Sequence, residues 1–130
     1  TLKVLMRDSL NSDLMVCFFG NNSSVISKKA IFPKGELYSE ESLSHIDFVY
    51  DKRTIIFSQE YGSASPEGWY ICYINYNIKS KELVVDSISN RWKNFKAKTD
   101  ADFIKSKTKS IKINLKEFNA QKEFYNLNRL

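Results

Sequence analysis

The chain has 130 residues, 42% of them hydrophobic, which is enough for one globular domain that needs no disulfide or metal for stability. Its longest apolar runs, Leu14–Phe19 and Trp69–Ile74, are far shorter than the roughly 20 residues of a membrane-spanning helix, so we expect no such helix. The formal charge of +5 is uneven: residues 1–90 contain 9 basic and 11 acidic residues, whereas residues 91–130 contain 11 and 4. Such a basic region is typical of contact with nucleic acid, membrane or acidic protein, although solvated surface lysines explain it more often.

The first 90 residues have the alternation and turn residues of short strands. Gly20–Ser23 and Pro33–Gly35 are typical turns. In residues 69–78 the even positions are all apolar, while the odd positions change from apolar to polar at Asn75 and Asn77. We therefore expect one end of this strand to be buried on both faces and the other end to be exposed to solvent on one face. The predicted strands, about seven, are 2–6, 14–19, 25–32, 46–50, 54–58, 69–78 and 83–89.

Beyond residue 90 the pattern predicts two helices. Thr99 and Asp102 have the spacing of a capping box, which predicts a short helix over residues 99–107. The segment Asn114–Glu117 provides a second, sharper start. A helix over residues 115–126 would direct a set of apolar side chains toward the sheet, namely Leu115, Phe118, Phe124, Tyr125 and Leu127.

These elements predict an α+β fold. We expect a twisted antiparallel β-sheet of about seven short strands, with two C-terminal helices packed on it. No repeat or linker divides the chain, so residues 1–130 are expected to form a single domain. Within it, residues 1–90 would be mostly strands, and residues 91–130 mostly helical and basic.

Residues suited to catalysis or metal binding are few and scattered. His45 is the only histidine; it lies two residues before Asp47 on a predicted strand, and no second histidine is present as a base. Together with Cys17 and Cys72 it leaves a four-ligand zinc site incomplete. The carboxylates are dispersed, and the four glycines form no phosphate-binding pattern. We therefore expect no enzyme, no catalytic residues, no metal and no cofactor.

Both cysteines lie within the most apolar segments of the chain. This placement favours buried free thiols, whereas a disulfide between the two strands is the alternative. No secretory leader is evident at the start of the chain, so we expect a cytoplasmic protein. Because Thr1 would also follow from trimming of a leader, an extracytoplasmic location stays open.

The aromatic residues make up 14% of the chain. Trp69, Tyr73, Tyr76, Trp92 and Phe95 would stack on nucleobases if they were exposed near lysines, although filling a core is the more frequent role of such residues. The densest mixture of aromatic and basic residues is a candidate nucleic-acid-binding surface, made of Arg91, Trp92, Lys93, Phe95, Lys96 and Lys98. Nucleic-acid binding by the basic C-terminal third is therefore the alternative function.

Three C-terminal stretches resemble one branch of the immunity proteins of bacterial contact-dependent growth inhibition. They are Asn94-Phe95, Asp100 to Thr108, and Asn114 to Asn128 with its run Lys122-Glu123-Phe124-Tyr125-Asn126. With the strand pair before them, they cover about 60 residues. The resemblance implies a small cytoplasmic α/β protein that binds and blocks a toxin domain, which is a ribosomal-RNA-cleaving nuclease in that branch. The matched positions are structural, and the net positive charge departs from the frequent acidity of the family, which leaves the toxin type open.

The leading hypothesis is therefore an immunity or inhibitor protein, with a cognate toxin domain as its partner and no membrane contact. An acidic side of the domain would steer toward a basic toxin and speed association. Tyr38 is included as an aromatic anchor. The candidate partner-binding residues are Glu36, Tyr38, Glu40, Glu41, Asp47 and Asp51.

Overall fold

The computed structural model describes residues 2–8, 13–20, 23–28, 31, 44–49, 52–62 and 67–130, without the side chains of residues 2–8, 44, 45 and 48. In these ranges the chain forms eight strands, one α-helix and one 3-10 turn. The strands build two antiparallel sheets, of three and of five strands. A mostly antiparallel β fold is thus confirmed. The expectation of one sheet with two helices is wrong, because the described residues form two sheets and one α-helix.

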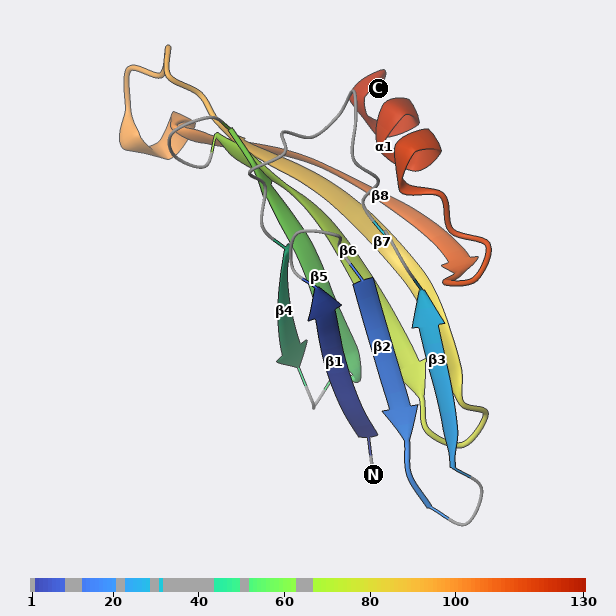
Figure 1. Ribbon diagram of the computed structural model, residues 1–130. Helices are drawn as coiled ribbons and strands as arrows, with labels where there is room; N and C mark the ends of the chain where they lie inside the picture. The colour runs from blue at the N-terminus through green and yellow to red at the C-terminus, as the bar shows by residue number, and fades with distance from the viewer. Residues whose placement is uncertain are drawn as a thin grey trace.

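The smaller sheet has the order β1 (Leu2–Asp8), β2 (Asp13–Phe18) and β3 (Ser24–Lys28). It lies against one face of the larger sheet (Figure 1). The alternation in β2 directs three apolar side chains into the space between the sheets, where they are almost fully buried: Leu14, Val16 and Phe18.

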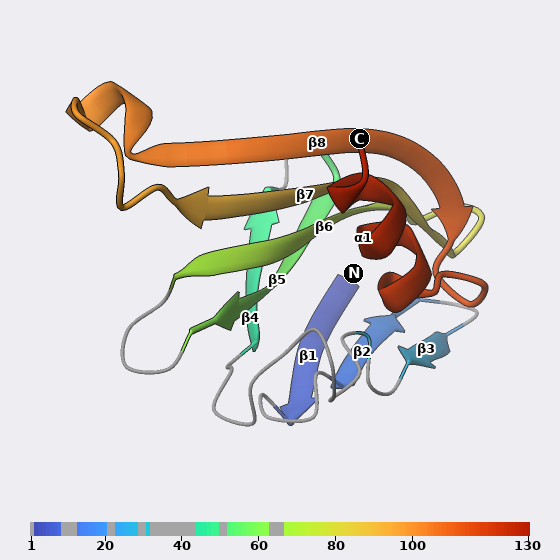
Figure 2. The same ribbon diagram turned by 90° about the horizontal axis from the view of Figure 1, so that it is seen from above.

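The larger sheet is a meander of consecutive antiparallel strands. Its strands lengthen along the chain, from six residues in the first to twelve in the fourth. Figure 2 shows the helix and the smaller sheet on the same side of it. The five strands are β4 (Ser44–Val49), β5 (Thr54–Tyr61), β6 (Gly68–Asn77), β7 (Glu82–Lys93) and β8 (Ile104–Asn114).

Strand β8 occupies a region that was predicted to be partly helical. The Thr99 hydroxyl does contact the Asp102 carboxylate at 2.9 Å, but the helical turn there is only the 3-10 turn η1 (Asp100–Asp102). From Ile104 the side chains alternate with a period of two, and several are β-branched, so pairing with β7 prevails. Residues 91–130 are therefore not mostly helical.

The helix α1 (Ala120–Asn128) begins later than predicted. Its N-cap is Asn119, whose side-chain oxygen accepts a hydrogen bond from the Lys122 backbone N–H at 3.1 Å. The side chain of Asn114 instead accepts from the Lys116 N–H at 3.0 Å, in a turn that precedes the helix. Both asparagines thus stabilise a turn of chain, but only the second starts an α-helix.

The core lies between the five-stranded sheet on one side and the smaller sheet with α1 on the other. We call the face of the larger sheet that points into this core the inner face. Of the apolar side chains predicted to reach the core from the C-terminal helix, Tyr125 is 56% exposed, contrary to expectation, and the other four are buried. The inner face contributes Ile55, Phe57, Tyr70, Cys72, Ile74, Tyr76, Leu83, Val85 and Ile88 to one cluster with the buried residues of β2 and α1.

A β-bulge in β7 decides which of its side chains enter the core. Tyr73 pairs with Ser87 and Ile74 pairs with Val85, so Asp86 is an extra residue in the strand. Before it, odd-numbered residues such as Val85 are buried; after it, even-numbered Ile88 and Asn90 are buried. The spacing of the inward side chains thus changes from two to three at this point: Leu83, Val85, Ile88.

A polar cluster connects the end of α1 to the sheet. We call Tyr61, Tyr70, Asn90 and Asn128 the Asn90 cluster. The Tyr61 hydroxyl donates to the Asn90 side-chain oxygen at 3.1 Å, and the Asn90 amide donates to Asn128 at 2.9 Å. Tyr70 also hydrogen-bonds Asn128, and its ring lies 4.8 Å from that of Tyr61. The buried amide of Asn90 is therefore satisfied on both sides, as a polar group in a core must be.

Gly68 lies beneath the Tyr61 ring, and a Cβ atom at this position would overlap that ring. We expect Gly68→Ala to displace Tyr61 from Asn90 and to lower the free energy of unfolding by about 1–3 kcal/mol, measured by urea denaturation. In a Tyr61→Ala background the same substitution should have almost no effect, because the overlapping ring is gone. Equal losses in the two backgrounds would contradict this explanation.

The environment of Tyr61 should also make the stability of the protein sensitive to alkaline pH. Burial, and to a lesser extent Tyr70, raises the pKa of Tyr61 to about 12 from its ordinary 10.0. Between these two values the folded state holds more protons than the unfolded state, so stability is fully present below about pH 10 and falls as the pH rises toward 12. Because the ring is only half-buried, we expect Tyr61→Phe to reduce this loss by about 1–2 kcal/mol.

Urea unfolding at several pH values from about 9 to about 12 tests this expectation. The matched control is Tyr125→Phe, which removes the hydroxyl of an exposed tyrosine on α1. Identical pH slopes for the wild type and Tyr61→Phe would show that the expectation is wrong.

Candidate functional site

The outer face of the five-stranded sheet is the candidate site. In the part of the chain that the structure describes, the smaller sheet and α1 both lie on the inner face, so no element covers the outer one (Figures 1 and 2). Strand alternation places Trp69, Ile71 and Tyr73 there, all of them half-buried. Large apolar side chains in such a position are typical of a surface that binds a partner.

A depression of about 420 Å³ lies on this face, and we call it the outer hollow. The strand register shows that it runs diagonally across the sheet: Asp47 is level with Ile56 and Tyr73, whereas Arg91 is level with Trp69, four residues before Tyr73 in β6. It is lined by Asp47, Ile56, Ser58, Trp69, Ile71, Tyr73, Arg91 and Ile104.

Small hydroxyl side chains on β7 and β8 make the surface of the outer face lower there than at the aromatic residues of β6. Beyond the bulge, alternate residues of β7 and their partners in β8 point outward, and most are Ser or Thr. The Thr108 hydroxyl donates to that of Ser89 at 3.1 Å. A floor of short side chains therefore borders the taller Trp69 and Tyr73, and consists of Ser87, Ser89, Ser106, Thr108 and Ser110.

The two ends of the outer hollow have opposite charge. Asp47 is exposed on β4, and Arg91 is exposed on β7, three strands away. The Lys93 ammonium lies 5.8 Å from the centroid of the Trp69 ring, a cation–π arrangement that adds positive charge at the Arg91 end. The hollow is thus acidic at one end, basic at the other and apolar between them.

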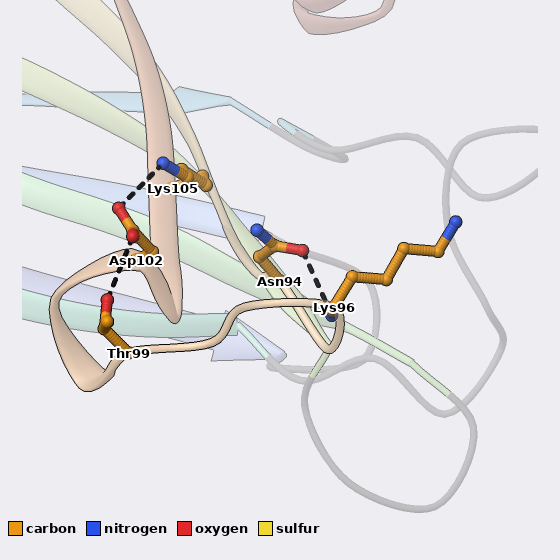
Figure 3. Close-up of polar contacts among 5 residues, drawn as sticks. All are labelled: Asn94, Lys96, Thr99, Asp102 and Lys105. Carbon is orange, nitrogen blue, oxygen red and sulfur yellow. Dashed lines mark hydrogen bonds and ion pairs between the residues drawn. The ribbon is translucent and has the colours of Figure 1, made fainter.

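The connection between β7 and β8, residues 94–103, projects beyond the body of the sheet, and we call it the hairpin tip (Figure 1). Phe95 is 69% exposed, and its ring meets that of Phe103 edge to face at 6.1 Å. Figure 3 shows Asp102 between Thr99 and Lys105, whose ammonium is 3.4 Å away. These contacts, the Thr99 hydrogen bond first, lower the pKa of the Asp102 carboxyl.

The six residues predicted to bind nucleic acid all lie in the described part of the chain and at one end of the same hairpin. They do not share one face. Arg91 and Lys93 point outward beside Trp69, whereas Trp92 is level with Gly68 on the inner side. Phe95, Lys96 and Lys98 are exposed on the hairpin tip, where the Lys96 backbone N–H is held by the Asn94 side chain at 3.2 Å (Figure 3). Tyr76, also considered for stacking, is buried.

Of the residues predicted to bind a protein partner, Asp47 alone falls within the described ranges. It is exposed and lines the outer hollow. The other five, Glu36, Tyr38, Glu40, Glu41 and Asp51, lie outside the described residues.

The prediction from sequence missed most of the outer hollow. The odd positions of residues 69–73 were recognised as apolar, but they were expected to be covered. The alternating hydroxyls at residues 106–110 carried a usable signal, a period of two, which the helix prediction for residues 99–107 obscured. That alternation predicts a strand over residues 106–110 that pairs with β7. The outward hydroxyls of this strand would then lie next to Arg91.

Both cysteines are free and buried, which confirms the favoured prediction and excludes the Cys17–Cys72 bridge in this structure. Burial raises the pKa of the Cys72 thiol, which disfavours the reactive thiolate. Within the described ranges, no group of three or more His, Cys, Asp and Glu residues is arranged to hold a metal ion. Nor does any helix among these residues have the length and apolarity needed to cross a bilayer.

Comparison of the chain with known protein families, with curated proteins and with solved structures gave no match.

Proposed function

We propose that this protein is a cytoplasmic immunity or inhibitor protein, which neutralises a cognate toxin domain by forming a stoichiometric complex without catalysis of its own. The observation that carries the proposal is the outer hollow, which no element of the described residues covers and where Trp69 lies beside Arg91, with Tyr73 four residues away on the same strand. Tryptophan, tyrosine and arginine are the residue types that contribute most to protein–protein binding energy, above all in patches that exclude water.

The sheet is well suited to stoichiometric inhibition. A partner bound over the outer hollow would contact side chains of all five strands, from Asp47 on β4 to Ile104 on β8. Such a rigid, preorganised surface loses little conformational entropy on binding, which favours high affinity. The C-terminal stretches resemble immunity proteins of contact-dependent growth inhibition. This resemblance supports a toxin domain as the partner, and a nuclease is the first toxin type to test.

The proposal predicts that the gene immediately upstream encodes a large secreted protein with a toxic domain. Co-expression of this protein with that toxic domain tests the proposal. We expect a 1:1 complex in size-exclusion chromatography and protection of the cells from growth arrest. Trp69→Ala should weaken the complex about 30-fold or more, as removal of an aromatic anchor does. Tyr125→Ala, which removes an exposed aromatic ring from α1, is the matched control and should leave affinity unchanged.

Circular dichroism and thermal unfolding of both variants separate loss of binding from loss of the fold. If the two proteins form no stable complex at micromolar concentration, this function is wrong.

A second candidate, binding of single-stranded nucleic acid, is favoured by one observation: exposed aromatic and basic residues lie close together around the β7–β8 hairpin. Arg91 and Lys93 flank Trp69, and the hairpin tip adds Phe95, Lys96 and Lys98. Open antiparallel sheets bind single strands by stacking bases on aromatic rings while cations neutralise phosphates.

Fluorescence anisotropy with oligo(dT) at increasing salt tests this candidate. If about four cations contact phosphates, log K should fall with log salt at a slope of about −3. The double variant Lys96→Gln/Lys98→Gln should reduce that slope by about half, while Lys116→Gln/Lys122→Gln, two exposed cations away from the hairpin, should leave it unchanged. Absence of binding at low salt, or a flat response, removes the candidate.

A further inference from the structure

We infer that the outer hollow takes one amphipathic segment of a protein partner in a fixed orientation. The segment carries a basic side chain over Asp47, aromatic or aliphatic side chains between Tyr73 and Trp69, and an acidic side chain over Arg91 and Lys93. This inference rests on the proposed function and specifies the chemistry that the partner must present.

The length of the hollow sets the length of the segment. From Asp47 to Arg91 the hollow crosses three strand spacings and moves four residues along the strands. With about 4.8 Å between strands and about 3.4 Å per residue, its diagonal is roughly 20 Å. That span corresponds to about 13 residues of helix or about six of extended chain. One continuous segment is therefore long enough to contact both ends.

The opposite charges at the two ends fix the direction in which the segment binds. A cation near Asp47 and an anion near Arg91 are both attracted, whereas the reversed segment places like charges together at each end. Juxtaposed like charges at an interface oppose binding, so we expect the two directions to differ in affinity. Arg91 also has the planar donor geometry that holds a carboxylate with two hydrogen bonds.

The middle of the hollow selects apolar side chains. Ile56, Ile71 and Tyr73 line it on β5 and β6, and the hydroxyl side chains of β7 are level with Ile71 and Tyr73 on the next strand. A volume of about 420 Å³ lies in the range of pockets that enclose a ligand with many atoms, so several side chains of one segment fit together. Burying them supplies the non-directional part of the binding energy.

Protein fits this hollow better than nucleic acid does. The exposed carboxylate of Asp47 lines one end of the hollow. A phosphate backbone laid along the same diagonal would pass this carboxylate and be repelled there. A polypeptide, in contrast, supplies either sign of charge where it is needed.

The test uses a displayed library of random peptides of about 16 residues, selected on the wild-type domain. We expect enriched peptides to share an acidic residue and a basic residue on either side of an aromatic or aliphatic group. Their affinity should fall about tenfold or more for Arg91→Glu and for Asp47→Lys. Lys122→Glu and Glu117→Lys make the same charge changes at exposed positions outside the hollow, and should leave affinity unchanged.

Selection on the variants provides the sharper result. Arg91→Glu should enrich peptides with a base in place of the acid, and Asp47→Lys should enrich peptides with an acid in place of the base. Failure to enrich any peptide, enrichment without this charge pattern, or equal binding to the variants and the wild type would each overturn the inference.

The inference and the proposed function fail separately. If the charge pattern is found but no toxin complex forms, the hollow binds as inferred and the toxin-inhibitor function is wrong. If the toxin complex forms and is insensitive to Arg91→Glu and Asp47→Lys, the function stands and the inferred occupant is wrong.

Discussion

The single extra residue at the Asp86 bulge is the constraint on which the rest of the structure depends. In a regular strand the residues that share a face keep one parity, so β7 would continue to turn odd-numbered side chains inward after Val85. The bulge shifts the parity, and Ile88 and Asn90 enter the core while Ser87 and Arg91 leave it. A β-bulge is a known means of re-aiming side chains without breaking a sheet.

Two consequences follow on opposite faces of the sheet. Inside, Asn90 reaches Tyr61 and Asn128, so the C-terminal end of α1 is held over β7 by satisfied hydrogen bonds. Outside, Arg91 lies beside Trp69, next to short hydroxyl side chains. The position of the helix and the composition of the outer hollow therefore have one origin. An antiparallel sheet can stay stable with only one face in a core, which leaves the other face available for a partner.

The positions of the strands could be predicted from the sequence, but the way in which the strands pair into sheets could not. Local alternation located most of β1 to β7, and the apolar even positions of β6 predicted its buried face. The division into two sheets could not be read from local pattern, because it depends on which strands pair. The side chains of Thr99 and Asp102 do contact each other, but Thr99 makes no capping hydrogen bond to the backbone, and the helical turn has only three residues. Residues 104–114 form a strand because they pair with β7. This is a long-range effect, which the local secondary-structure propensity of these residues does not reveal.

The candidate site was predictable only in part, for the same reason. Asp47 and Arg91 were each chosen from the sequence, but for two competing functions, and the diagonal register of β4 to β7 places them at opposite ends of one hollow. Trp69 and Tyr73 were recognised as aromatic residues of one strand, yet whether they face a core or solvent depends on which side α1 and the smaller sheet occupy.

The basic C-terminal third also has a structural explanation, and this changes the meaning of the net charge. Lys105, Lys107 and Lys109 alternate along β8, an edge strand, where lysines discourage pairing with other chains. The Lys107 ammonium lies 2.8 Å from the Leu130 carbonyl oxygen and 3.4 Å from that of Asn128, and so offsets the negative end of the α1 dipole. Part of the positive charge of residues 91–130 thus has a structural role. In the proposed function, the charges that decide what binds are the few around the outer hollow, and these include both signs.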